Sequence, residues 1–394
     1  MEYELLEKHK PVIFNCQVCS VCQRGPWNPY PPRGPTSDRL CPEYEKFRTL
    51  THSALGRIQA ARWMLEGQYE PTEDFVKVLY DCLLCGACST VGCVVDKDHV
   101  PMFRDMRADL VNIGILPPEP FRKTAAVIEK EGNRFGRPRE ERGKWAEGMD
   151  IPVQADLVYF AGCVASYRAP QLAQATARML QHSGTTFAIL GKEEQCCGSP
   201  LVSSGQTELF ESVVRSNIAA LKKAGAKQVV TSCACGYNVL KFDYPKVAGE
   251  LDFEVIHITE LLAKLLEEGK LEPANAVNAK VSYQDPCHLV RLGGKVIKEP
   301  RQVIRSIPGV DLVEMEGSGR DTQCCGRFPV ELPELSMMTG TNRVNDAIDC
   351  GADTIVTACS FCDWNLRRAA KSTGADIEVI DIGQFLSRSL GIEL

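Results

Sequence analysis

The chain has 394 residues, with 45 Lys and Arg against 51 Asp and Glu, so its formal net charge is -6. This length predicts about two or three domains, whose cores need no covalent cross-links. Hydrophobic residues make up 44% and charged residues 24% of the chain, which excludes collagen-like, coiled-coil and largely disordered proteins. The mildly acidic balance argues against nucleic acid as a partner, because nucleic acid binding needs clustered positive charge.

Cysteine usage is the unusual feature, with 19 Cys against only 6 His. Many cysteines form disulfides in secreted proteins, whereas in cytosolic proteins they bind metal or carry out chemistry. Residues Met1–Glu4 lack the basic region of a signal peptide, and the most apolar run, Val158–Ala165, is too short to span a membrane. We therefore expect a cytoplasmic protein without an integral membrane span, whose cysteines bind metal.

Residues 1–115 are predicted to form a mostly helical N-terminal domain. Apolar residues recur three and four positions apart in His52–Gln68 and Val100–Ile113, and a further helix is expected at Thr72–Tyr80. Residues 116–150 follow as a linker rich in proline, glycine and mixed charge, which predicts an exposed connection. The alternative for this segment is a docking strip for a partner subunit.

Short β-rich runs alternate with helical patterns from about residue 155 onward, which predicts a mainly parallel α/β sheet. The predicted strands are Leu157–Phe160, Thr186–Leu190, Gln228–Thr231 and Phe253–Ile256. The predicted helices are Gln171–Ser183, Thr207–Ala224 and Glu260–Glu267.

This half of the chain also repeats itself. Residues 224–233 match residues 350–359 without a gap, and other landmarks recur at a nearly constant offset, which indicates a tandem duplication. We expect two α/β lobes, 151–275 and 276–394, related by a pseudo-twofold axis, with their cysteines facing a shared cleft. The whole chain is thus predicted to be α+β, with a helical domain followed by duplicated α/β lobes.

Two groups of cysteines in residues 1–115 have the spacing of iron–sulfur ligands. Three cysteines in a C-x-x-C-x-x-C turn plus a distant fourth is the bacterial ferredoxin pattern for a cubane [4Fe–4S] cluster. In two-cluster ferredoxins the fourth cysteine serves the other cluster, so we assign the fourth ligands crosswise. The predicted sets are Cys16, Cys19, Cys22 and Cys93 for one cubane, and Cys82, Cys85, Cys88 and Cys41 for the other.

Structural zinc is the alternative for these two groups, although the third cysteine of each triplet would then be surplus. Two details depart from the compact ferredoxin pattern. Cys93 precedes Val94 rather than proline, and Cys41 lies far downstream of Cys22.

Each lobe carries five further cysteines: one alone, an adjacent pair before glycine, and a closely spaced pair. The second-lobe set is Cys287, Cys324, Cys325, Cys359 and Cys362, and the first-lobe set is Cys163, Cys196, Cys197, Cys233 and Cys235. Five thiolates exceed the four that a cubane or a zinc ion needs. A distorted cluster with bridging thiolates would use all five.

The duplicated pattern resembles the CCG domain found in the B and D subunits of heterodisulfide reductase, which is shared with iron–sulfur subunits of glycolate and lactate oxidation systems. The resemblance rests on Asp285–His288, Cys324–Gly326, Thr357–Cys362 and Gly132–Gly136. A two-cubane domain fused to a CCG pair is the layout of the D subunit, which combines what the C and B subunits supply separately. Similar subunits occur in large cytoplasmic complexes such as the ATP-independent benzoyl-CoA reductase.

The resemblance implies that each five-cysteine set holds a non-cubane [4Fe–4S] assembly, where a disulfide is reduced or electrons are relayed. One position departs from the pattern, because aligning the two repeats places Gly236 opposite Cys362. The first repeat therefore has C-x-C, and either Cys235 binds iron from a shifted position or the first site is altered. One or two non-cubane clusters are thus expected, with iron bound through the cysteines.

Several other residues have competing interpretations. His288 follows Cys287, where it is a candidate proton donor or, as we favour, a residue that orients Cys287. Cys350 is expected to be a buried apolar thiol rather than a ligand. Three basic residues have two interpretations: they hold an anionic substrate or cofactor near the second site, or they lie on a solvated helix face. These residues are Arg291, Lys295 and Arg301.

The dinucleotide-binding fingerprint is absent from the sequence, so we expect flavin and NAD to be bound by another chain. The favoured hypothesis is an iron–sulfur electron-transfer subunit of a cytoplasmic multi-subunit oxidoreductase. Its electrons would come from a flavin-containing partner similar to the A subunit of heterodisulfide reductase, and a separate catalytic reductase subunit is a further candidate partner. The alternatives are the iron–sulfur subunit of a 2-hydroxyacid oxidase and, in another class, a zinc-binding scaffold.

Overall fold

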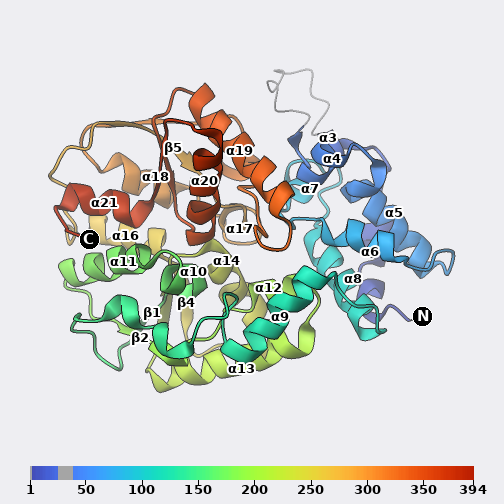
Figure 1. The fold of residues 1–394 in the computed structure, drawn as a ribbon, viewed down its shortest axis with the longest axis horizontal. Coiled ribbons are helices and arrows are strands. Elements are labelled where there is room, and N and C mark those ends of the chain that lie inside the picture. The colour runs from blue at the N-terminus through green and yellow to red at the C-terminus, as the bar shows by residue number, and fades with distance from the viewer. Residues whose placement is uncertain (1, 25–38) are drawn as a thin grey trace.

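A computed structural model describes the chain at residues 2–24 and 39–394. The N-terminal part is a cluster of short helices, drawn in blue to cyan in Figure 1. Its helices are α1 (Glu4–Glu7), α2 (Lys10–Phe14), α3 (Val21–Arg24), α4 (Pro42–Phe47), α5 (Ala54–Leu65), α6 (Glu73–Tyr80), α7 (Ala87–Thr90) and α8 (Val100–Asn112). The three predicted helices are confirmed as α5, α6 and α8, and the ferredoxin-like character of this part stays a prediction.

Residues 116–150 are packed against the rest of the molecule. Helix α9 (Glu119–Glu131) occupies the first part and buries Phe121 and Ile128, and Arg142 and Trp145 are buried further along. The expectation of an exposed connection is therefore wrong. Prolines and charges dominate the composition of this segment, but apolar residues at helical spacing form a buried face between them. The domain boundaries themselves stay predictions.

The first lobe alternates strands and helices as predicted. Its strands are β1 (Leu157–Phe160), β2 (Ala188–Ile189), β3 (Gln228–Thr231) and β4 (Glu254–His257). Its helices are α10 (Gly162–Tyr167), α11 (Pro170–His182), α12 (Ser199–Ser203), α13 (Thr207–Lys223), α14 (Ala234–Asn238), α15 (Tyr244–Ala248) and α16 (Ile258–Glu267). One π-helical turn, Val239–Asp243, joins α14 to α15.

The second lobe repeats this order. Its strands are β5 (Ala279–Gln284), β6 (Val310–Val313), β7 (Thr354–Thr357) and β8 (Glu378–Asp381). Its helices are α17 (Cys287–Val290), α18 (Lys298–Arg305), α19 (Pro333–Asp349), α20 (Ser360–Thr373) and α21 (Ile382–Leu390). The two sheets are parallel throughout and have the same topology, β2-β1-β3-β4 and β6-β5-β7-β8.

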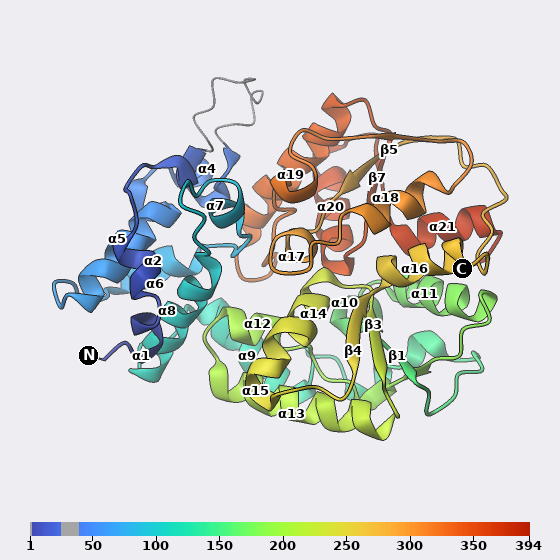
Figure 2. The same cartoon turned by 180° about the vertical axis from the view of Figure 1, so that it is seen from behind.

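The two lobes contact each other reciprocally. Helix α11 packs on α21 while α16 packs on α18, and α14 packs on α17 while α10 packs on α20. By their order in the two repeats, α11 corresponds to α18, α16 to α21, α10 to α17 and α14 to α20. Exchanging the repeats therefore turns each contact into the other member of its pair, as a pseudo-twofold axis requires. Figures 1 and 2 show the lobes side by side, with the N-terminal helices against one end. None of the helices in the described ranges combines the length and apolar character that a bilayer crossing requires.

The sheets place cysteines at one edge. Cys163 and Cys233 follow β1 and β3, and Cys287 and Cys359 follow β5 and β7. The carboxyl ends of parallel strands lie at the same edge of a sheet, which is where ligands bind in open α/β folds. The duplicated topology therefore gathers each lobe's thiols at its strand ends.

A buried ion pair attaches the 116–150 segment to the first lobe. The Arg142 guanidinium donates to Glu194 Oε1 from Nη2 at 2.6 Å and from Nε at 3.1 Å. The same carboxylate accepts the backbone N–H groups of Ala161 and Gly162 at 3.0 and 2.9 Å. Glu194 thereby fixes the turn between β1 and α10, which begins beside Cys163.

We expect Glu194→Ala to lower the free energy of unfolding by about 3–5 kcal/mol, because it leaves the buried Arg142 charge without its partner. Asp156→Ala is the matched control, since Asp156 forms an exposed ion pair with Lys227. That change should cost less than about 1 kcal/mol. Anaerobic chemical denaturation followed by circular dichroism would measure both, and equal effects would contradict this account of the turn.

Candidate metal centres

The structure brings the predicted N-terminal cysteines together around two cavities. One cavity of about 370 Å³ is lined by Cys16, Cys19, Cys22 and Cys93. A second cavity of about 320 Å³ is lined by Cys41, Cys82, Cys85 and Cys88. Each fourth cysteine thus lies beside the triplet of the other sequence group, which is the crosswise arrangement predicted. That these thiols bind iron stays a prediction.

Left-handed residues within the two triplets turn the chain so that all three thiols face one side. Val18 and Ser20 have positive φ in the first loop, and Leu84 and Gly86 have positive φ in the second. A β-branched residue such as Val18 is uncommon in this region, and its strain persists only where the surrounding structure imposes it. This loop geometry is therefore what we expect where three thiols must face the same site.

Burial opposes the ionisation of the most enclosed of these thiols. It raises the pKa of Cys22 to about 12 and that of Cys85 to about 12. Thiolate is the form that binds metal, so a positively charged core is needed to displace the protons. The donor set, four cysteines at each cavity, therefore fits a metal cluster bound by thiolates. A single zinc ion would draw four sulfurs to about 2.3 Å from its centre.

The Cys41 site includes an acidic residue that the sequence analysis did not single out. The Cys41 thiol donates to Glu43 Oε2 at 2.9 Å, and Glu43 Oε1 accepts the backbone N–H of Leu83 at 2.5 Å. Arg57 is buried nearby and lines the same cavity. Glu43 thus connects the loop of the fourth cysteine to the loop of the triplet.

The second-lobe cysteines line a single cavity of about 280 Å³. All five predicted residues border it: Cys287, Cys324, Cys325, Cys359 and Cys362. The Cys325 thiol donates to Cys362 Sγ at 2.9 Å. Cys235 of the first lobe, together with His288 and Arg327, completes the wall. Thiols from both repeats therefore line this cavity, five from the second repeat and Cys235 from the first.

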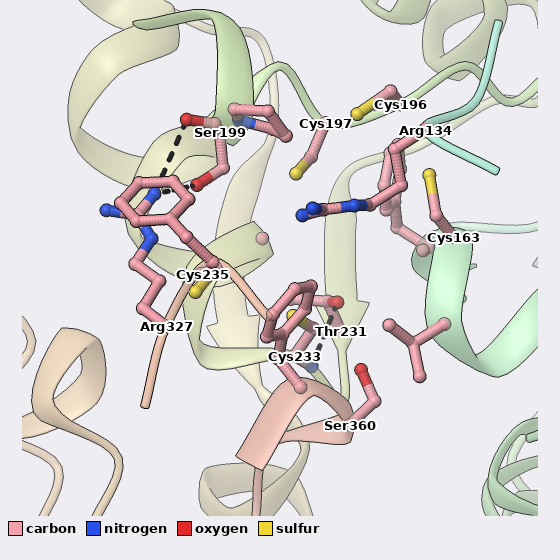
Figure 3. A pocket seen from close by; sticks show the side chains of 17 residues that line it. Arg134, Cys163, Cys196, Cys197, Ser199, Thr231, Cys233, Cys235, Arg327 and Ser360 are labelled. Carbon is pink, nitrogen blue, oxygen red and sulfur yellow. Dashed lines mark hydrogen bonds between the residues drawn. The ribbon is translucent and has the colours of Figure 1, made fainter. Parts of the chain in front are cut away.

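The first-lobe cysteines line a larger cavity of about 560 Å³, shown in Figure 3. They are the predicted set Cys163, Cys196, Cys197, Cys233 and Cys235. In Figure 3 the guanidinium of Arg134 points into the cavity, between the sulfurs of Cys197 and Cys163. Arg134 is held there by an ion pair with Glu331, in which Nη2 donates to Oε1 at 2.9 Å and to Oε2 at 3.0 Å.

The glycine of each Cys-Cys-Gly triplet is required by the backbone. Gly198 has φ +85° and Gly326 has φ +91°, in the left-handed region that favours glycine. A Cβ on Gly326 would also overlap the carbonyl oxygen of Ser336. Asn217 and Asn365 brace the two turns, since they donate to the carbonyl oxygens of Cys196 and Cys325 at 3.0 and 2.7 Å. The two asparagines come from helices that are not equivalent in the repeat, α13 and α20, so the repeat alignment gave no signal for them.

Arg327 lies where the two lobe cavities meet. It lines both cavities, and burial lowers the pKa of its guanidinium. Its Nη2 donates to Ser199 Oγ at 2.8 Å and to Ser203 Oγ at 2.7 Å, whereas Nη1 has no hydrogen-bond partner among the described residues. A buried cation in this position favours negative charge in the cavities.

His288 has the geometry of an orienting residue. Its Nδ1 lies 3.4 Å from Cys287 Sγ. Burial, reinforced by the charges of Arg327 and Arg104, lowers its pKa well below the usual range, which keeps the ring neutral near pH 7. A neutral ring can hydrogen-bond to the sulfur but carries no extra proton to deliver. The proton-donor role stays a prediction.

Two of the basic residues considered for anion binding are engaged within the protein. The Arg301 guanidinium is bidentate to buried Asp285 at 2.8 Å and also pairs with Glu314. Arg291 donates to the backbone carbonyl oxygens of Cys85 and Thr322. Lys295 is exposed. The hypothesis that Arg301 holds an anionic ligand is therefore wrong, because partners distant in sequence occupy its donors. Arg291 keeps a buried Nη2 without a partner among the described residues, so an anion-binding role for it stays a prediction.

The four cavities follow one another through the molecule. Burial and then the charges of Cys85, Cys82 and Cys22 raise the pKa of Cys88, which makes Cys22 a neighbour from the other N-terminal cavity. Cys324 of the second lobe likewise acts on Cys85. The sulfurs of Cys359, Cys233 and Cys235 lie within 4.8 Å of one another across the lobe boundary.

The sequence matches the cysteine-rich CCG domain family twice, at residues 157–241 and 281–367. Each range includes the five predicted cysteines of its lobe and ends before the last strand, β4 or β8. A crystal structure of a hypothetical protein from Helicobacter pylori has a TM-score of 0.59 at 13% identity, covering 100% of this chain and 78% of that one. That likeness shows the fold alone.

Curated relatives resemble the chain over most of its length. The D subunit of the dihydromethanophenazine:CoB–CoM heterodisulfide reductase of Methanosarcina mazei is 37% identical, over 97% of this chain and 95% of its own. The corresponding protein of Methanosarcina barkeri is 38% identical over 81% and 80%. The B subunit of the fumarate reductase (CoM/CoB) of Methanothermobacter marburgensis is 34% identical over 78% of this chain and 61% of its own.

These relatives are reductase subunits, and a probable iron–sulfur-binding oxidoreductase of Bacillus subtilis is 31% identical over 80% of this chain and 47% of its own. With its two CCG domains, this chain is therefore an iron–sulfur oxidoreductase subunit. Identity of this level extends through both the helical domain and the duplicated lobes. The chain belongs to the D-subunit family of heterodisulfide reductases, a family of CCG-domain proteins.

Proposed function

We propose that this chain is a cytoplasmic electron-transfer subunit that passes electrons between a flavoprotein partner and its two CCG lobes. It would bind two cubane clusters in the N-terminal domain and non-cubane clusters in the lobes. The observation that carries the proposal is the unbroken order of four cysteine-lined cavities, from the Cys16 site through the Cys41 and Cys287 sites to the Cys163 site. When bound, such clusters accept and release single electrons.

The residues between the sites suit such a relay. Arg291 belongs to the second lobe, and its Nε donates to the Cys85 carbonyl oxygen at 3.0 Å. This contact fixes the loop of the Cys41 site against the second-lobe site. Phe121, Phe328 and Leu335 extend the hydrophobic core of the N-terminal domain to the same boundary, which excludes water there. A short, rigid and dry connection favours electron transfer over side reactions.

Disulfide reduction is the second candidate activity, favoured by the size of the first-lobe cavity. Its walls combine the apolar Phe160, Val164 and Phe361 with the guanidinium groups of Arg134 and Arg327. A disulfide has an apolar body and yields two anionic thiolates on reduction, so this lining suits both states. The relatives are named for a CoB–CoM heterodisulfide, and the substrate class proposed for this chain is a disulfide.

Metal analysis of anaerobically purified protein tests the proposal as a whole. Four [4Fe–4S] clusters correspond to about sixteen iron atoms and as many acid-labile sulfides per chain. About twelve of each would indicate that one lobe binds no cluster. Zinc without sulfide would reject the proposal in favour of a scaffold. Co-purification with a flavoprotein would identify the electron source.

The crosswise assignment of the fourth ligands predicts the effect of one substitution. Cys41→Ser should remove or alter one cubane signal in electron paramagnetic resonance spectra and leave the site of Cys16 intact, because Cys41 lines the Cys82 cavity. Cys350→Ser is the matched control, since Cys350 borders none of the four cavities and donates to the Ala347 carbonyl oxygen. Loss of the Cys16-site signal in Cys41→Ser, or of any signal in the control, would contradict the assignment.

The charge of Arg327 predicts a shift in reduction potential. Arg327→Gln removes a buried positive charge from the wall of both lobe cavities, so the potentials of the lobe sites should fall. The shift is expected to be on the order of tens of millivolts. Arg215→Gln is the control, because Arg215 is exposed on α13 in an ion pair with Glu211. Potentiometric titration would measure both, and unchanged lobe potentials in Arg327→Gln would contradict this role.

A further inference from the structure

The first repeat differs from the second at one pair of neighbouring positions. The first has Cys233-Ala-Cys235-Gly236, whereas the second has Cys359-Ser-Phe361-Cys362. Aligned on their first cysteines, the repeats place Cys235 opposite Phe361 and Gly236 opposite Cys362. The thiol that would complete the first-lobe set has therefore moved by one residue.

A shift of one residue redirects a side chain on a helix. Cys233 caps α14, which contains both Cys235 and Gly236. Successive side chains of an α-helix are rotated by about 100°. Cys235 therefore cannot take the direction that a side chain at position 236 would have.

The space that the missing thiol would occupy is present. Gly236 lines the first-lobe cavity. A Cβ built on it would lie 3.4 Å from Thr231 Oγ1 and 3.6 Å from Cys233 Cβ, which is ordinary contact. Nothing in the backbone therefore requires glycine here, and the first-lobe site has an open position on this side.

The thiol of Cys235 is instead directed toward the second lobe. Its sulfur lies within 4.8 Å of Cys359 Sγ, and Cys235 lines the second-lobe cavity as well as its own. In Figure 3 its sulfur lies on the side of Arg327, away from Cys163. Arg327 also lines both cavities. Its Nη1 has no hydrogen-bond partner among the described residues, so a buried positive charge lies next to the Cys235 thiol.

The pseudo-twofold relation gives an independent check of this direction. Phe361 occupies the position equivalent to Cys235 in the second repeat. Its ring lines the first-lobe cavity in addition to its own, and Arg134 lies over it at 4.8 Å. In both repeats, then, this helical position reaches across the boundary into the opposite lobe.

We propose that Cys235 is a ligand of the second-lobe site, supplied across the lobe boundary, and that the first-lobe site retains four cysteines and an open position beside Gly236. This inference rests on the proposed function, because it concerns how the clusters are held. The second-lobe site then has six thiols and the first-lobe site has Cys163, Cys196, Cys197 and Cys233. A single residue separates Cys233 from Cys235, so the backbone at the start of α14 connects the two sites.

The test compares spectroscopic signals in anaerobically prepared holoprotein. Cys362→Ser identifies the second-lobe signal as the one that it removes or alters, and Cys197→Ser identifies the first-lobe signal. Cys235→Ser is then examined by electron paramagnetic resonance and Mössbauer spectroscopy, with iron content and the two cubane signals as evidence of folding. We expect it to change the second-lobe signal and to leave the first-lobe signal as in the wild type.

A second variant moves the thiol without changing composition. Cys235→Gly combined with Gly236→Cys restores the spacing of the second repeat, so it should change the second-lobe signal and also alter the first-lobe signal. This variant carries the test if Cys235→Ser fails to fold.

An unchanged second-lobe signal in either variant would overturn the assignment, as would loss of the first-lobe signal, alone or with the other, in Cys235→Ser. Wild-type protein without iron and sulfide would instead reject the proposed function itself, so the two failures are distinguishable.

Discussion

The structure depends on one constraint, which is that buried thiols converge in an interior where burial opposes their ionisation. Burial, reinforced by the charges of neighbouring cysteines, raises the pKa of Cys22 to about 12. Hydrogen bonds from Cys233 and Cys235, by contrast, lower the pKa of Cys359 well below the usual range. Such a mixture of protonated and ionised sulfurs is unfavourable in an apolar interior and becomes favourable around a cationic iron core. The strained loops, the left-handed glycines and the buried arginines all serve to hold these thiols in place.

Duplication explains how one chain arranges so many thiols. Each parallel sheet presents its strand ends to one edge, and the pseudo-twofold axis brings the two edges together. The helical domain then lies against the second lobe, where Arg291 reaches the Cys85 loop. The result is a sequence of sites rather than isolated ones. Within the closely spaced cysteine pair, the two repeats differ at Cys235 and Gly236.

Much of this arrangement could be predicted because it depends on patterns of residues that are close in sequence. Alternating strands and helices predicted β1, β3, α11 and α13. Cysteine spacing predicted which thiols share a cavity, including the exchange of Cys41 and Cys93. What could not be predicted depends on contacts distant in sequence. The buried face of α9 lies among prolines and charged residues that favour an exposed segment. The ion pair of Arg301 with Asp285 leaves no mark in the local pattern, because the two residues lie in different elements. The position of Arg327 between two cavities likewise follows from tertiary structure alone.

The most direct test of the central claim is an anomalous difference map at the iron absorption edge, from crystals grown under strict exclusion of oxygen. The account predicts iron density in the cavities of Cys16, Cys41, Cys287 and Cys163, in that spatial order, with sulfur ligands from the cysteines that line each cavity. Well-ordered crystals with no iron in these cavities, or with single zinc ions coordinated by the same thiols, would contradict it.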